Sequence, residues 1–302
     1  MAIPIFFVHK TNSSYLKYAL KQARKFNPDS PIYLLGDDEN NKYRFVTHIN
    51  ISDYSSSAEE FKTIYKHMSA VPYEINLIWF QRWFYINEFV RGKGIEYFIY
   101  LDSDVLVYSN LTEAIKPYKN ILIANTGRCM PATTYFSNSK ALSDFCDFMI
   151  SQYKESRYIA RMTRDWEDGH KPRNYGGIDD QVMFEYYSME FPEKFGKLDI
   201  IANDSVFDSH IRISDGFEMI EEGEDKNKRR KWNNNILQGF HIQNKKWIRF
   251  HNIHFHGHAK KIMYRNYKGG GYYLPRIKEY IQELRDKYQL RTKFREMINY
   301  YS

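Results

Sequence analysis

The sequence predicts an α/β fold whose central sheet is mainly parallel and which is followed by a C-terminal helical appendage. Through the first half of the chain, short apolar runs alternate with segments of helical periodicity, the order that βαβ units produce. Most of these runs are continuous, as in strands buried on both faces of a parallel sheet. The chain has 302 residues, 43% of them hydrophobic and 27% charged, which is typical of a folded protein with a sizeable core.

Each element follows from a local pattern. The expected strands are the apolar runs at residues 3–8, 31–35, 45–51, 97–101, 105–107 and 120–124. The expected helices, with apolar residues every three or four positions, cover residues 16–26, 58–68, 75–90 and 140–153. Ser13 and Ser14 are candidate caps of the first helix, Asn27-Pro28 ends it, and the glycines of residues 91–94 break the third.

The second half is less regular. Residues 156–175 are polar and broken by Gly and Pro, which predicts a loop over a site, and the charge-dense residues 221–231 predict a solvated turn. No internal repeat or clear linker interrupts the chain, so we expect one domain over residues 1–265 and an appendage over residues 266–302. In the appendage, three glycines precede an apolar stripe with a basic face, which either packs on the domain or lies on an anionic membrane surface.

The composition restricts the partners. A formal net charge of +7 favours phosphates, anionic membranes or nucleic acid. The charges are dispersed apart from residues 226–231 and the C-terminus, and they form no basic stripe with interleaved aromatics, so we expect no nucleic-acid partner. The first residues do not resemble a signal peptide, no apolar run approaches about 20 residues, and the two cysteines, Cys129 and Cys146, suit reduced buried thiols. We therefore expect a cytoplasmic protein whose contact with a membrane, if it has one, is peripheral.

The strongest chemical signal is Asp102-Ser103-Asp104, between two apolar runs. Residues two apart in an extended segment point to the same side, so both carboxylates can face one ion. Ligands bind open α/β sheets just beyond the strand ends. A hard cation such as Mg²⁺ or Mn²⁺ prefers oxygen ligands and keeps positions open for substrate phosphates. The pattern predicts a metal–diphosphate site, and the alternative is a solvated loop.

Three further segments carry candidate site residues. His254, Gly257 and Lys260 lie in a His-rich run, where imidazole can bind a metal and Gly and Lys can bind a phosphate, unless the run is a plain surface turn. Asp179-Asp180-Gln181 follows paired glycines and places polar side chains beside a backbone that can approach a ligand. Arg82, among aromatics on the helix before the acid pair, addresses an anionic ligand or an acid of the protein.

Together, the order of these segments resembles the A-type nucleotide-sugar glycosyltransferases, and especially the retaining family of glycogenin and the bacterial lipopolysaccharide galactosyltransferases. That family has an Arg-bearing helix, a Tyr-Leu-Asp-x-Asp strand, a Gly/Asp-Gln segment and a closing His-Phe-x-Gly-x-x-Lys motif. The matching segments here are scattered over residues 3–260. The resemblance implies a Rossmann-type nucleotide-sugar domain and an enzyme that transfers a sugar from a nucleotide diphosphate, with UDP as the expected nucleotide, to a hydroxyl of a glycan, glycolipid or glycoprotein.

The resemblance also implies the roles of individual residues. Asp102, Asp104 and His254 would hold Mn²⁺ or Mg²⁺, and Asp180 and Gln181 would face the transferred sugar. The residues implied in donor binding are Val8, His9, Asn12, Asp37, Arg82, Asp102, Ser103, Gly257 and Lys260. Two segments depart from the family: Lys261-Ile262 replaces Pro-Trp, and residues 9–12 replace the base-reading Asp that follows the first strand. Asp37 is a candidate to take over part of that role.

Two alternatives remain open at this point. An inverting transferase needs a carboxylate as base on the acceptor hydroxyl, with Asp179 or Asp180 as candidates, whereas a retaining enzyme would place Gln181 near the anomeric carbon. A sugar nucleotidyltransferase also combines an α/β sheet, paired acids and a divalent ion. It is expected to carry a Gly-rich phosphate loop after the first strand, and residues 8–14 contain no glycine.

Overall fold

The computed structural model describes residues 1–127, 130–168, 177–222 and 225–268. Its main sheet has seven strands in the order β3-β2-β1-β4-β7-β6-β8. The strands are β1 (Ile5–His9), β2 (Ile32–Gly36), β3 (Thr47–Asn50), β4 (Phe98–Leu101), β6 (Ile123–Thr126), β7 (Met130–Phe136) and β8 (Phe195–Lys197). Four of the six pairings are parallel, and those of β7 with β4 and β6 are antiparallel. The expected α/β fold with a mainly parallel sheet is confirmed.

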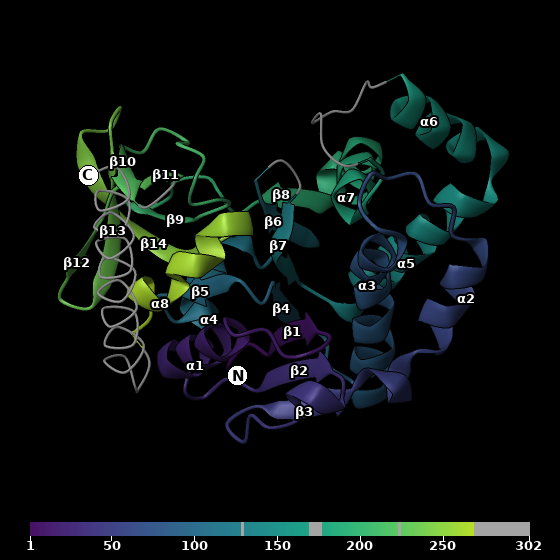
Figure 1. Cartoon of the computed structure of the whole chain (residues 1–302), viewed down its shortest axis with the longest axis horizontal. Helices are drawn as coiled ribbons and strands as arrows, with labels where there is room; N and C mark the ends of the chain where they lie inside the picture. The colour runs from purple at the N-terminus through teal and green to yellow at the C-terminus, as the bar shows by residue number, and fades with distance from the viewer. Residues whose placement is uncertain (128–129, 169–176, 223–224, 269–302) are drawn as a thin grey trace, which may run out of the picture.

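A second sheet lies beside the first (Figure 1). It contains β12 (Arg230–Asn233), β13 (Ile236–His241), β14 (Lys246–His254) and β5 (Val105–Val107) in that order, with β9 (Ser205–Phe207) also paired to β14. A hairpin of β10 (Met219–Glu222) and β11 (Asp225–Lys228) lies nearby. Because β4 and β5 are consecutive in the chain, the turn between them passes from one sheet to the other.

Helices cover both faces of the main sheet. On one face lie α2 (Ser56–Ile64), α3 (Tyr73–Lys93), α5 (Ser139–Lys154), α6 (Ser156–Glu167) and α7 (Asp180–Glu190), and on the other lies α1 (Leu16–Phe26). The short helices are α4 (Leu111–Ala114), α8 (Met263–Asn266), η1 (Asp38–Asn40), η2 (Ile51–Tyr54), η3 (Lys116–Tyr118), η4 (Pro192–Lys194) and η5 (Gly257–Ile262). Alternate residues of β1 enter different cores: Phe6 packs with α3, and Ile5 and Phe7 pack with α1 and the second sheet. Among the described helices, none combines the length and apolarity that crossing a bilayer requires.

Several sequence expectations were wrong in detail. Residues 156–167 form helix α6 instead of a loop, because Ile159, Met162 and Trp166 recur at helical spacing and pack on the core. Of the charged residues 221–231, positions 221–222, 225–228 and 230–231 lie in β10, β11 and β12, and residues 223–224 lie outside the described part of the chain. Lys228 is buried there as the partner of the buried Asp208. Neither Ser13 nor Ser14 caps α1, which begins after Tyr15.

Other expectations fall partly or wholly outside the described residues. The expected domain boundary after residue 265 lies within α8, and the C-terminal helix expected over residues 275–302 is not among the described residues. Cys146 is a buried free thiol, as expected, and Cys129 lies outside the described part of the chain.

Candidate metal centre

The acid pair lies in the turn that joins the two sheets. Asp102 follows buried strand β4, and its backbone N–H donates to the carbonyl of Ala132 on β7 over 2.8 Å. The N–H of Val105 donates to the carbonyl of Asp102 over 3.0 Å, which closes the turn around Asp104. Strand β5 then pairs with β14, so that Val105 lies opposite His254. The register of the second sheet therefore brings together Val105 and His254, which are 149 positions apart in the chain.

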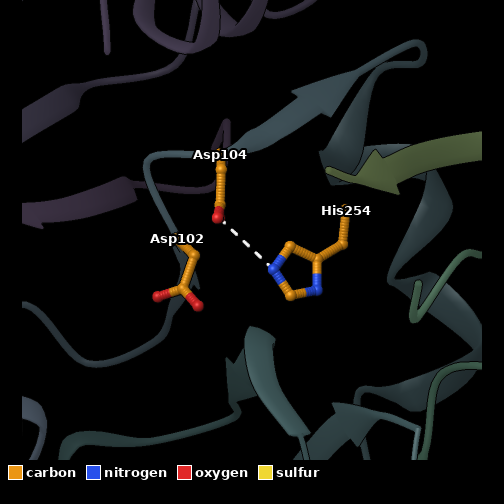
Figure 2. A group of neighbouring side chains, drawn as sticks. All are labelled: Asp102, Asp104 and His254. Atoms are coloured by element: carbon orange, nitrogen blue, oxygen red, sulfur yellow. Dashed lines mark ion pairs between the residues drawn. The ribbon is translucent and has the colours of Figure 1, made fainter. Parts of the chain in front are cut away.

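Asp102, Asp104 and His254 face one another (Figure 2). One ligand atom from each can be chosen so that all three lie within 4.8 Å of one another. Two carboxylates and an imidazole are a donor set suited to Mn²⁺, and Asp102, with a side chain 24% exposed, lies on the open side of the group. Asp104 and His254 are almost fully buried.

His254 is oriented by a backbone carbonyl. Its Nδ1 donates to the carbonyl oxygen of Ser209 over 2.8 Å, so the proton is on Nδ1 and Nε2 offers its lone pair unless the ring is charged. That Nε2 lies 3.3 Å from Asp104 Oδ1. A lone pair this close to a carboxylate oxygen needs a cation between the two, either a proton or a metal ion. Such a carbonyl behind the imidazole is the usual outer partner of a metal-binding histidine.

Asp104 also faces Lys260. Lys260 Nζ lies 3.0 Å from Asp104 Oδ2, and its ammonium lies over the ring of Tyr15. Burial alone would raise the pKa of Asp104, but His254 and Lys260 outweigh it and hold that pKa well below its usual range. The carboxylate therefore stays charged, as a metal ligand must.

Asp102 is held by Arg82 on helix α3. Arg82 Nη1 donates to Asp102 Oδ1 over 2.7 Å and to the hydroxyl of Tyr100, which itself donates to the same Oδ1 over 2.6 Å. One oxygen of Asp102 is thus occupied by the protein, and Oδ2 is left for an ion. Burial alone would lower the pKa of Arg82, but Asp180, Tyr100 and Asp102 raise it well above its usual value.

Asp180 completes this buried chain. Its Oδ2 accepts hydrogen bonds from Arg82 Nε over 3.0 Å and Nη2 over 2.5 Å, and from the indole of Trp83 over 2.8 Å. Asp180 is only 1% exposed. Of the two readings of Arg82 in the sequence, an ion pair with acids of the protein is therefore confirmed, while contact with a donor stays an expectation.

The neighbours of Asp180 have their own positions. The Asp179 side chain accepts from the backbone N–H of Val182 and so caps helix α7, while Gln181 is half-buried in its first turn. Gly177 has φ +113°, and a Cβ there would lie 2.3 Å from the carbonyl oxygen of Met68. Gly177, the second of the paired glycines, thus allows the chain to lie against the backbone of Met68 shortly before α7 begins.

The residues after β1 form a braced loop. His9 Nδ1 hydrogen-bonds with Ser103 Oγ at 2.9 Å, which places this loop beside the acid pair. Asp37 caps η1 and accepts from the backbone N–H of Thr11 over 2.7 Å. Asn12 is exposed and accepts from a tyrosine hydroxyl, whereas Val8 is buried in the sheet. Of the residues expected to bind the sugar donor in this region, Ser103 lies between Asp102 and Asp104 in the chain, and His9 hydrogen-bonds to it.

Several residues near the site were not predicted from the sequence. Ser209, Arg212 and Lys228 belong to the second sheet and its connections, where no motif or spacing distinguishes them. They became visible only through the contacts of β14. Gly257 has a left-handed φ of +63° and begins η5, which carries Lys260, while its contact with a phosphate stays an expectation.

No protein-family model matches the chain, and no curated protein matches it significantly in sequence. Part of the chain is similar to solved structures, glycosyltransferases among them. One is the glycosyltransferase GlyE of Streptococcus pneumoniae TIGR4, with 16% identity and a TM-score of 0.37 over 66% of this chain and 45% of that one. Another is an active-site mutant of LgtC, with 15% identity and a TM-score of 0.37 over 65% and 73% of the two chains.

A third similar structure is a cytidylyltransferase of Leptospira borgpetersenii, with 11% identity and a TM-score of 0.34 over 65% of this chain and 75% of that one. The chain spans less than half of the GlyE chain that it matches. Values this low leave the function to be judged from the site itself.

Proposed function

We propose that this chain is a divalent-metal-dependent glycosyltransferase that moves a sugar from a nucleotide diphosphate donor, UDP-linked, to an acceptor hydroxyl of a glycan, glycolipid or glycoprotein. The observation that carries the proposal is that Asp102, Asp104 and His254 lie close together and that Lys260 pairs with the carboxylate of Asp104. A bound Mn²⁺ or Mg²⁺ would stabilise the negative charge that develops on a departing diphosphate. Lys260 would contribute a second positive charge to that group, and Gly257 would allow its close approach.

The turn between β4 and β5 supports this proposal because it is braced from behind. Arg82 and Tyr100 fix one oxygen of Asp102, and Ser209 fixes the ring of His254. Electrostatic stabilisation of a leaving group needs donors and ligands that are already in place before the reaction. In this role Arg82 and Asp180 are positioning residues, and Gln181, on the same turn as Asp180, is the residue we place nearest the sugar.

Retention of configuration is the stereochemical outcome that the site favours. Inversion requires a free carboxylate as base on the acceptor hydroxyl. Asp180 is buried against Arg82 and Trp83, and Asp179 caps α7, so both carboxylates already serve the fold. A retaining enzyme needs no such base. Nuclear magnetic resonance of the anomeric proton in the first-formed product distinguishes the two outcomes, and an inverted product would overturn this part of the proposal.

The direct test is calorimetric titration with UDP, GDP and CDP, each with Mn²⁺, with Mg²⁺ and with EDTA. We expect UDP to bind only when the metal is present. Binding of GDP or CDP in place of UDP would overturn the choice of base and leave the class of enzyme standing. A nucleotidyltransferase would instead release pyrophosphate from a nucleoside triphosphate and a sugar phosphate, which a coupled pyrophosphate assay detects.

The C-terminal segment adds a proposal about location that rests on sequence alone. The basic face of residues 275–302 would hold a cytoplasmic enzyme against an anionic membrane, close to lipid-linked acceptors. Sedimentation with vesicles containing phosphatidylserine, for the full chain and for a chain ending at residue 271, tests this. If both forms stay in the supernatant at low salt, the membrane contact is wrong.

A further inference from the structure

Arg212, a cation outside the segments singled out in the sequence, lies beside Gly257 in the turn after β14 that is proposed to bind the diphosphate. A Cβ placed on Gly257 would lie 3.1 Å from Arg212 Nη2, so the guanidinium covers this glycine directly. Gly257 begins the short helix that carries Lys260. Two cations from different parts of the chain therefore flank the same turn.

The backbone explains how Arg212 reaches this place. Strand β9 pairs parallel with β14, and the chain continues alongside β14 beyond the end of the strand, where the N–H of Ile211 donates to the carbonyl of His254 over 3.1 Å. The next residue, Arg212, consequently lies beside the turn that follows His254. The carbonyl of Ile211 accepts in turn from the N–H of Lys228, whose ammonium is buried between Asp208 and Asp215. This ion cluster fixes the segment that bears Arg212.

The guanidinium is incompletely used by the protein. Its Nη1 lies 3.3 Å from Asp225 Oδ1, a long contact through a single nitrogen. Its Nε is buried and has no hydrogen-bond partner among the described residues. An arginine presents five donors in a fixed fork, which matches two oxygens of a phosphate. With a side chain 29% exposed, Arg212 remains accessible to a ligand.

The charge balance of the site leaves room for another cation. In the contacts of the candidate metal centre, two cations face three carboxylates. The cations are Arg82 and Lys260, and the carboxylates are those of Asp102, Asp104 and Asp180. A divalent ion changes this excess of one negative charge into an excess of one positive charge, while the diphosphate of a nucleotide sugar brings two negative charges.

We propose that Arg212 binds the diphosphate of the donor beside Gly257, with its guanidinium fork on the β-phosphate, which is the phosphate bonded to the sugar. This inference rests on the proposed function and names a residue that no motif indicated. Asp225, the partner of Arg212, would weaken the interaction by competing for the guanidinium.

The test is calorimetric titration of the full chain with UDP and with UMP in the presence of Mn²⁺. Arg212→Gln should weaken UDP binding by roughly tenfold or more, since a hydrogen bond to a charged group contributes about 1.5–3 kcal/mol. Arg212→Lys, which keeps the charge but loses the fork, should fall between Arg212→Gln and the unaltered chain. Asp225→Asn should tighten UDP binding, and UMP should respond less than UDP to every change.

The matched control is Arg229→Gln, which removes the same charge from an arginine of the same region that pairs with Glu218 and stacks over Trp247. It should leave UDP binding unchanged, as Arg212→Gln should leave the affinity for Mn²⁺ alone and the melting temperature unchanged. If UDP binds Arg212→Gln as it binds the unaltered chain, the role of Arg212 is wrong and the proposed function stands. If the unaltered chain binds no nucleoside diphosphate with Mn²⁺, the proposed function itself fails.

Discussion

Arg82 Nη1 donates to Asp102 Oδ1 over 2.7 Å, and this contact joins helix α3 to the turn that carries the candidate metal ligands. The same guanidinium holds Asp180 at the start of α7. One buried arginine thereby fixes two acids that come from different elements. Its contribution to the candidate metal centre is geometric: it sets which oxygen of Asp102 would face a bound ion.

We therefore expect Arg82→Lys to weaken Mn²⁺ binding by about tenfold, the usual effect of losing an outer partner of a metal ligand. Lysine keeps a charge near Asp180 but cannot contact both acids at once through a planar fork. Titration followed by the loss of the free-Mn²⁺ electron paramagnetic resonance signal measures this. Arg91→Gln, on the exposed end of the same helix, is the control, and equal Mn²⁺ affinity in both variants would contradict the positioning role.

Substitution of Lys260 should separate metal binding from donor binding. Lys260 pairs with Asp104 at 3.0 Å and so competes with an ion for that carboxylate. Lys260→Met should bind Mn²⁺ alone at least as tightly as the unaltered chain and should bind UDP more weakly. Asp104→Asn should lose both. Parallel loss of Mn²⁺ and UDP affinity in Lys260→Met would show that Lys260 supports the metal ligands instead of the diphosphate.

Gly177 should be costly to replace. Its φ of +113° is rarely adopted by L-residues, and a Cβ would overlap the carbonyl oxygen of Met68. We expect Gly177→Ala to lower the free energy of unfolding by about 2 kcal/mol or more. Gly92→Ala is the contrast, since nothing lies within 4 Å of a Cβ there and the helix should gain about 0.5–1 kcal/mol. Urea denaturation of both variants checks the opposite signs.

Lys228 should be a major contributor to the stability of the β10–β11 hairpin and of the segment that follows β9. Its ammonium is buried between Asp208 and Asp215 and covers the ring of Phe217. Lys228→Met leaves Asp208 buried without its cation, which should cost about 3–5 kcal/mol. Adding Asp208→Asn should recover part of the loss, because the uncompensated charge is then gone. If the double variant is no more stable than Lys228→Met, the cost arises from packing and not from charge.

His251 should make the fold sensitive to acid. Burial and the nearby Arg249 lower the pKa of His251 to about 4 from its ordinary value of 6.5. The unfolded chain therefore takes up a proton between these values that the folded chain does not, so the free energy of unfolding falls as the pH falls from 6.5 to 4. His251→Gln should reduce that slope relative to the unaltered chain. Urea unfolding at several pH values across this range measures both slopes.

The first half of the fold was predictable because its signals are local. Helix α1 spans the residues expected, since five apolar side chains repeat at helical spacing before Asn27-Pro28. The acid pair was found for the same reason, as a polar break between two apolar strands. The resemblance implied that Asp102, Asp104 and His254 lie together, and the structure places them in one group.

The rest depended on contacts that no local pattern encodes. A charged stretch is usually exposed, and only the acids Asp208 and Asp215 explain why Lys228 is buried. Arg212 was missed because its place follows from the register of β9 against β14, which joins residues about 45 positions apart. Helix α6 was missed because polar residues outnumber the three apolar ones on its buried side.

The pairing of β5 with β14 also decides when the site can exist during synthesis. The acids at residues 102–104 leave the ribosome long before His254, which ends β14, and Lys260, which follows that strand. A nascent chain that has not yet released β14 has the acids but neither the imidazole nor the ammonium that faces them. The proposed metal site can consequently be complete only after β14 has been translated, when the main sheet has had the opportunity to form.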